Sequence, residues 1–162
     1  MNLFTGESSA EFFGGAVPQS VRRLLDEAVG APAPQVESLL WTAHACAPEC
    51  LPVYYLLYKF HASRRQFDRA EQAARKGIAI AAQQAALDAD WSKVQPQHGD
   101  FAATGPARFW LFSLKALAFI CLRSGRPDEA RALVEHIARL DATHGLGGDV
   151  IASLLDGSVP KG

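Results

Sequence analysis

The stretch FDRAEQAARKGIAI, residues 67–80, has the same pattern as PDEARALVEHIARL, residues 127–140. In both, small or apolar side chains recur at intervals of three and four residues, and acidic residues stand in the first turn. This spacing gathers the apolar side chains on one face of an α-helix. Each stretch therefore predicts an amphipathic helix that packs against a neighbouring element.

Prolines mark where most of the helices begin. Segments with the same helical spacing directly follow Pro18, Pro34, Pro52, Pro106 and Pro127. Proline suits the first turn of a helix because its missing N–H would have no partner there. We predict a helix after each of these prolines, one from about 67 to 90, and a short last one over 150–155. No segment alternates with a period of two, so the predicted fold class is all-α.

Composition and charge limit the function classes. A chain of 162 residues suits one domain, and 49% of them are hydrophobic, so it can build a core. A net charge of −1 offers no strong field for nucleic acid or a membrane surface. The longest apolar stretch, 109–122, is shorter than the about 20 residues that a membrane span needs. Residues 1–16 lack Lys and Arg, and the cysteines make no disulfide framework, so we expect a cytoplasmic protein.

A repeat organises most of the chain. Residues 51–84 and 111–144 superpose on a period of about 34 residues, and the same period counted backwards gives 17–50. In this frame Phe67 matches Pro127, and Ala70 matches Ala130. The arrangement resembles the tetratricopeptide repeat family, whose repeats are helix–turn–helix units. The resemblance implies a right-handed α-solenoid of three degenerate repeats, with small residues such as Gly77 where two helices touch.

The resemblance also implies a domain organisation. One tetratricopeptide-like domain covers 17–155, with an insertion at 85–110 and a capping helix at 149–155. A flexible N-terminal segment, 1–16, precedes it and a tail, 156–162, follows it. The insertion and the weak match of the first repeat depart from the family's pattern.

Family geometry implies a concave groove lined by the first helix of each pair. Carried over by position, it includes Val21, Leu25 and Ser63, and its partner-binding set is Tyr55, Lys59, Phe112, Lys115, Phe119 and Arg123. The rings would supply buried area, and the cations would pair carboxylates of a segment that mixes apolar and acidic residues. In the alternative interpretation the two phenylalanines belong to the core and the lysines are only solvated. The family's Asn-based carboxylate clamp is absent, because the only asparagine is Asn2. Chaperones of the Hsp70 and Hsp90 kind are therefore poor candidate partners.

Two further segments are secondary contact candidates. The N-terminal segment carries Phe4, Phe12 and Phe13, and it either folds back into the groove or becomes ordered on a partner. The polar loop at 92–105, next to Trp91, contains Phe101. Long loops in compact domains are usually functional or disordered.

Reactive chemistry is not expected. His44, Cys46 and Cys50 form the one metal-like cluster, but Pro48 stands between the cysteines and zinc sites need closer pairs. Core or surface roles are the prediction for these three residues, and whether they ever bind a metal stays open. The sequence contains no phosphate-binding loop, and no nucleophile stands beside His98, Gly99 and Asp100 in the loop. We predict no catalytic residues, no cofactor and no nucleic-acid partner.

These observations predict a non-enzymatic protein–protein interaction module, an assembly factor or dedicated chaperone-like adaptor. In length and repeat number the chain is similar to the three-repeat chaperones of bacterial type III secretion. A self-associating structural module that forms a homodimer is one alternative. An accessory factor of a metalloenzyme complex, with nitrogenase maturation as an example, is another.

Overall fold

The computed structural model describes residues 17–103 and 105–141. The regular secondary structure in these ranges is helical. The helices are α2 (Gln19–Gly30), α3 (Ala33–Cys46), α4 (Leu51–Ser63), α5 (Phe67–Ala85), α6 (Pro106–Arg123) and α7 (Pro127–Leu140), with the 3-10 turns η1 (Trp91–Lys93) and η2 (Pro96–His98). None of the residues in these two ranges forms a strand, so the all-α prediction is confirmed for them. The helix predicted at 150–155, the N-terminal segment and the tail lie outside the described residues.

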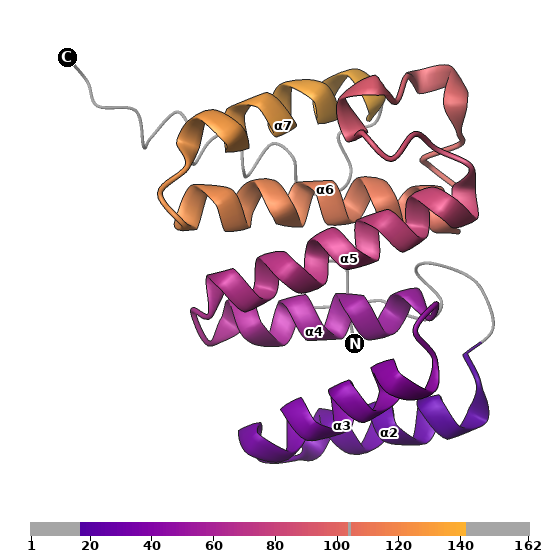
Figure 1. Cartoon of the computed structure of the whole chain (residues 1–162), viewed down its shortest axis with the longest axis vertical. Helices are drawn as coiled ribbons and strands as arrows, with labels where there is room; N and C mark the ends of the chain where they lie inside the picture. Colours follow the sequence, from indigo (N-terminus) through magenta and orange to yellow (C-terminus); the bar gives the residue numbers. More distant parts are fainter. Residues whose placement is uncertain (1–16, 104, 142–162) are drawn as a thin grey trace.

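The helices stack in chain order, each running antiparallel to the next (Figure 1). α5 packs against both α4 and α6, and α4 also contacts α6 directly. The turns that close the pairs α2–α3, α4–α5 and α6–α7 all lie at one end of the molecule, on the left in Figure 1. We call this end the turn end. The arrangement brings residues from separate helix pairs together there.

Prolines occupy the first turns that the sequence predicts. Pro34, Pro52, Pro106 and Pro127 stand at the first or second position of α3, α4, α6 and α7, and Pro18 caps α2. α5 ends at Ala85, earlier than the predicted end near residue 90. Ala86 adopts a left-handed conformation, and the Leu87 N–H donates to the Ala82 carbonyl at 2.8 Å. Leu87 turns back into the core, so its burial overrides the helix propensity of the preceding alanines.

The pairs α4–α5 and α6–α7 are closed by the same turn. Arg65 and Gly125 both have positive φ, at 58° and 79°. The next N–H donates back to the third residue from each helix end, Gln66 to His61 and Arg126 to Cys121, both at 2.9 Å. This is the Schellman arrangement, which satisfies carbonyls that the helix itself leaves open. The α2–α3 connection at Ala31 is extended instead.

Gly77 of α5 lies close to both α4 and α6. A Cβ atom at this position would lie 2.8 Å from the Tyr54 Cβ on α4 and 3.2 Å from the Phe109 ring on α6. Real Cβ atoms essentially never come within 3.0 Å of another heavy atom. The glycine therefore sets the spacing of three helices, which is the kind of role that the sequence predicts for it.

The segment between α5 and α6 is packed against the helices. Val94 and Phe101 are buried, and the Phe101 ring lies 5.6 Å from that of Trp110. The Val94 carbonyl is 2.9 Å from His136 Nε2 on α7, whose ring also meets Trp91 edge-on at 5.4 Å. These contacts hold the loop predicted at 92–105 against α6 and α7.

Candidate partner-binding surface

The six predicted groove residues separate into a buried and an accessible group. All of them lie on α4 and α6, as the repeat frame implies. Tyr55, Phe112 and Lys115 are buried. Lys59 and Phe119 are half-buried, and Arg123 is exposed. Of the other groove positions, Val21 is buried, Leu25 is half-buried and Ser63 is exposed.

Tyr55 and Phe112 are buried like core residues, and their contact with a partner stays a prediction. Tyr55 is 0% exposed and Phe112 is 5% exposed. Their rings lie 5.8 Å apart, because α4 and α6 meet side by side at this level. Burial also raises the pKa of Tyr55 to about 12. The burial of both rings supports a role in stabilising the fold.

Lys115 is buried as well, and it binds a carboxylate of its own chain. Its side chain is 3% exposed and forms an ion pair with Asp141, which is 7% exposed and directly follows α7. A cation inside a protein needs an opposite charge and hydrogen bonds, because leaving water is costly for it. Lys115 obtains its carboxylate from its own chain, and the pair fastens the end of α7 to α6.

Cations stacked on aromatic rings remain accessible on α4 and α6. Lys59 Nζ lies 5.3 Å from the Tyr55 ring centroid, and the Arg64 guanidinium lies 5.6 Å from that of Phe60. The Arg123 guanidinium lies 5.5 Å from the Phe67 ring and 6.0 Å from the Phe119 ring. Burial lowers the pKa of Lys59. Such stacking holds a long side chain in place while its charge stays accessible.

These cations have no acidic partner among residues 17–103 and 105–141. The ion pairs there involve other groups, and none includes Lys59, Arg64 or Arg123. Sequence reasoning selected Lys59 and Arg123 but missed Arg64. A signal for all three was present, because each cation follows an aromatic residue by four positions on a helix.

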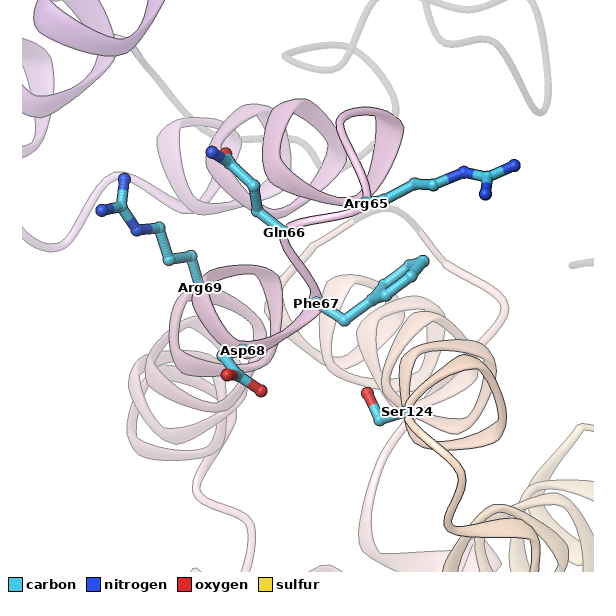
Figure 2. A pocket seen from close by; sticks show the side chains of 6 residues that line it. All are labelled: Arg65, Gln66, Phe67, Asp68, Arg69 and Ser124. Atoms are coloured by element: carbon cyan, nitrogen blue, oxygen red, sulfur yellow. The ribbon is translucent and has the colours of Figure 1, made fainter.

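An open depression of about 390 Å³ lies beside these cations at the turn end. Its lining comes from the α4–α5 turn, the start of α5 and the end of α6: Arg65, Gln66, Phe67, Asp68, Arg69 and Ser124 (Figure 2). Ser124 Oγ is buried and has no hydrogen-bond partner in the described part of the chain. The Arg69 guanidinium is bound to Glu37 of α3 at 3.0 Å. The depression is therefore lined by an aromatic ring, a hydroxyl and charges of both signs.

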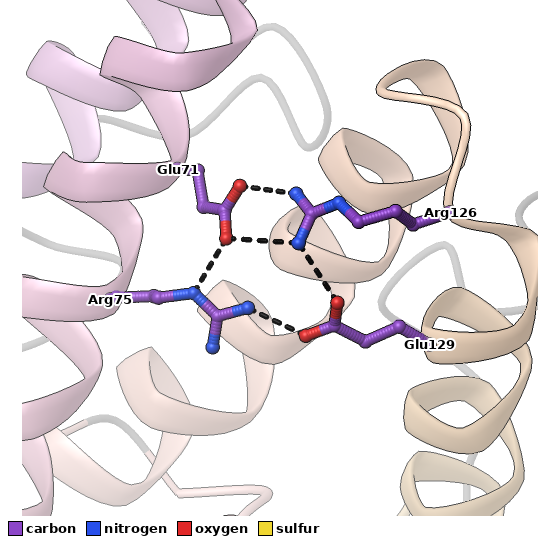
Figure 3. Close-up of polar contacts among 4 residues, drawn as sticks. All are labelled: Glu71, Arg75, Arg126 and Glu129. Atoms are coloured by element: carbon purple, nitrogen blue, oxygen red, sulfur yellow. Dashed lines mark hydrogen bonds and ion pairs between the residues drawn. The ribbon is translucent and has the colours of Figure 1, made fainter.

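A network of four charged side chains ties the last two helix pairs together (Figure 3). Arg75 of α5 binds Glu71 at 2.8 Å and Glu129 of α7 at 2.6 Å, and Arg126 binds the same two carboxylates. Burial alone would raise the pKa of Glu71, but the hydrogen bonds from Arg126 and Arg75 hold it below its usual value. Because every charge in the network is paired, we assign it to stability.

The secondary contact candidates are either partly or fully buried, which is unfavourable for contact with a partner, or lie outside the described residues. Phe101 is buried against Trp110, so it is corrected as a contact residue. Trp91 is half-buried and packs on His136. Phe4, Phe12 and Phe13 lie outside the described residues.

The cysteine cluster shows no metal-binding geometry within 17–103 and 105–141, where no three His, Cys, Asp or Glu side chains are placed to hold an ion. His44 Nε2 lies 3.3 Å from the Tyr54 hydroxyl, which also donates to the Pro48 carbonyl. Cys46 is exposed and Cys50 is half-buried, and both are free thiols. In the described ranges, no helix is both long and apolar enough to cross a lipid bilayer.

The fold and the surface define an all-helical protein of antiparallel helix pairs. The chain is 31% identical over 122 residues to a protein of Azotobacter chroococcum mcd 1, "Uncharacterized 19.8 kDa protein in nifW 5'region". The match covers 74% of this chain and 68% of the relative, so the chain belongs to the family of that protein. No family model and no solved structure matches the chain.

Proposed function

We propose that this protein is a non-enzymatic interaction module, an adaptor or dedicated chaperone-like assembly factor that binds a protein partner. The observation that carries the proposal is the set of accessible cations on α4 and α6, Lys59, Arg64 and Arg123, which lack acidic partners in the described residues. Each is held on an aromatic ring, so it is preorganised for a carboxylate. The proposal includes no catalysis, no cofactor and no nucleic acid.

The architecture supports the tetratricopeptide-like part of the proposal. Two helix pairs are closed by matching Schellman turns, at Arg65 and at Gly125. First helices of successive pairs, α4 and α6, are in contact, as in stacked repeats. In such a solenoid the first helices face one side of the molecule, where an elongated partner segment would lie.

We further propose nitrogen fixation as the setting in which the partner is found. The name of the Azotobacter relative assigns that protein to the region 5' of nifW. An accessory role in the maturation of nitrogenase, a large metalloenzyme, is compatible with a helical adaptor that has no chemistry of its own. The partner would then be a component of that enzyme or of its assembly apparatus.

A second candidate function is self-association through α2 and α3. Val29 is 78% exposed and Trp41 is 39% exposed. They are the exposed large hydrophobic residues in the described part of the chain. Both belong to the first helix pair, at the end of the stack. Exposed apolar side chains at the end of a helical stack favour contact with a second copy.

Affinity capture from the native organism tests the leading function. The bait is the full chain, and the variant is Lys59→Glu with Arg123→Glu. The matched control is Arg22→Glu with Lys76→Glu, which makes the same charge change at exposed positions on other helices. Circular dichroism establishes that all three proteins fold. A partner retained by the wild type and the control but lost by the variant supports the proposal.

Two outcomes contradict the leading function. Capture of the same partner by the Lys59/Arg123 variant moves the contact elsewhere. A wild-type protein that retains no specific partner and sediments as a dimer favours self-association. In that case Trp41→Glu should give a monomer.

A further inference from the structure

We propose that the α4–α5 and α6–α7 turns together bind an acidic segment of a partner protein, with Arg65 and Arg123 receiving its carboxylates. The binding surface consists of Arg65, Phe67, Phe119, Arg123 and Ser124, and we call it the turn surface. This inference rests on the proposed function, since it names the chemistry of the partner and the place where it docks. The surface lies at the helix ends, beyond the groove positions that family geometry selects, apart from Arg123 and Phe119.

Residues from two helices, α5 and α6, and from two turns meet at the turn surface. Phe67 begins α5 and lines the depression, and the Arg123 guanidinium lies 5.5 Å from its ring centroid. Figure 2 shows the Arg65 side chain and the Phe67 ring extending to the same side of the turn, away from Arg69. Arg65 and Phe67 thus line one open depression of about 390 Å³, and Arg123 stacks on the Phe67 ring.

Arg65 occupies a backbone conformation that disfavours it. Its φ of 58° belongs to the left-handed region, where a Cβ atom is crowded by the following carbonyl. The matched turn of the last pair has Gly125 there, which carries no such penalty. No hydrogen bond or ion pair of the Arg65 side chain occurs within the described residues to offset this strain. Strain of this kind concentrates at functional sites. A role of Arg65 in ligand binding would explain why the strained conformation is retained at the depression.

The charges around the turn surface favour an anionic ligand. Around this surface, the cations Lys59, Arg64, Arg65 and Arg123 form no ion pair within the described ranges. Of the carboxylates on the packed elements, Glu37 is taken by Arg69, and Glu71 and Glu129 by Arg75 and Arg126. Asp128 lies 3.5 Å from Arg131. Asp68 alone lines the depression without an ion pair among these residues, so positive charge is in excess.

The remaining polar group points to a hydrogen-bonding ligand. Ser124 Oγ is buried at the edge of the depression and has no partner in the described part of the chain. A buried hydroxyl without a partner is costly, and a carboxylate or a peptide group docked beside Phe67 can supply one. An acidic segment that carries an apolar side chain matches all three features: the guanidinium groups of Arg65 and Arg123, the Phe67 ring and a hydroxyl without a partner in the described residues.

Fluorescence anisotropy with a labelled glutamate-rich peptide containing one phenylalanine tests the inference. A lysine-rich peptide of the same length is the ligand control. The variants are Arg65→Gly and Arg123→Gln, and Arg22→Gln in the first turn of α2 is the matched control. Arg65→Gly removes the cation and also the backbone strain, so lost binding in this variant is not a sign of unfolding. We expect each of the two variants to weaken binding by about threefold to tenfold, as loss of a charge-assisted hydrogen bond does.

Equal binding of the glutamate-rich peptide by wild type, Arg65→Gly and Arg123→Gln overturns the inference. So does equal binding of the glutamate-rich and lysine-rich peptides. The failure of the proposed function is separate. If native capture yields a partner that Arg65→Gly still retains, the turn surface is wrong but the adaptor role stands. If native capture yields no partner, the adaptor role fails whatever the peptide does.

Discussion

Replacing Gly77 by alanine tests whether this residue sets the spacing of α4, α5 and α6. The added methyl carbon would lie 2.8 Å from Tyr54 Cβ, well inside the about 3.5–4.0 Å at which two carbon atoms pack best. The Tyr54 Cβ is attached directly to the α4 backbone, so it cannot move aside by a rotamer change. The ring of Phe109, 3.2 Å from the methyl group, would have to shift as well.

The expected magnitude follows from two opposing effects. Overpacking of a well-packed core costs about 1–3 kcal/mol, whereas alanine gains up to about 1 kcal/mol over glycine in a helix interior. We expect Gly77→Ala to lower the free energy of unfolding by about 1–2 kcal/mol. For a chain of this size that corresponds to a fall in Tm of about 2–8 °C.

Thermal and urea unfolding followed by circular dichroism measure the effect. The control is Gly30→Ala at the end of α2, where an added Cβ meets nothing within 4 Å. This variant should be as stable as the wild type or slightly more stable, because only the backbone term acts. A Gly77→Ala protein that melts at or above the wild-type temperature would refute the reasoning, since the three helices would then have room for the methyl group.

Three other predictions concern the turns, the tyrosines and the charged network. Arg65→Gly should raise the free energy of unfolding by about 0.5–1 kcal/mol, and Gly125→Ala should lower it by about 1 kcal/mol, because both positions have positive φ. Equal stability of the wild type and the two variants in urea unfolding would contradict the conclusion that both turns favour glycine. Burial raises the pKa of all three tyrosines of the chain, that of Tyr55 to about 12. Tyrosinate absorbance should therefore appear at higher pH than for free tyrosine, whose pKa is 10.0, and ordinary titration of all three tyrosines in the folded protein would contradict this. The stability that the raised pKa values supply is present below that usual value and is lost as the pH rises above it. Glu71 has a lowered pKa, so its contribution is present above its unfolded value of 4.5 and is lost as the pH falls through the folded value. Arg126→Gln should flatten this acid-side loss in urea titrations at several pH values, and an unchanged profile would show that the network contributes nothing.

The all-α class and most helix starts could be predicted because they depend on local signals. Proline in a first turn and apolar spacing of three and four residues act within a few residues of one another. The early end of α5 could not be predicted in this way. Its alanines favour helix, but burial of Leu87 in the core stabilises the structure more than a longer helix would. That burial depends on helices distant in the sequence.

The groove residues were only partly predictable for a related reason. A repeat frame gives the side of a helix on which a residue lies, but not how closely the neighbouring helix approaches. Tyr55 and Phe112 lie on the expected helices and are buried by their mutual packing. Lys115 is buried as well, because Asp141 at the end of α7 supplies its counter-charge. A pattern of aromatic residue and cation four positions apart would have distinguished Lys59 and Arg123, since that pattern keeps the charge at the surface.

The dependence of partner binding on salt separates the two surfaces that the structure offers. The α2–α3 pair has no basic residue in the last turn of α2, and it exposes Val29 and Trp41. The turn surface instead presents Arg65 and Arg123. Attraction between exposed charges is screened as the Debye length falls from about 10 Å at 0.1 M salt to about 3 Å at 1 M. Apolar contact is not weakened in this way, and salts such as sulfate strengthen it.

Capture of a partner through the turn surface should therefore weaken steadily as sodium chloride increases, and self-association through α2 and α3 should not. The measurement is the amount of partner retained, and the sedimentation coefficient of the protein alone, over a series of salt concentrations. Arg65→Gly should reduce the slope of partner retention against salt, because one charge fewer is screened. Retention that is independent of salt would assign the partner to the apolar end of the stack, since an interaction carried by two guanidinium groups cannot escape screening.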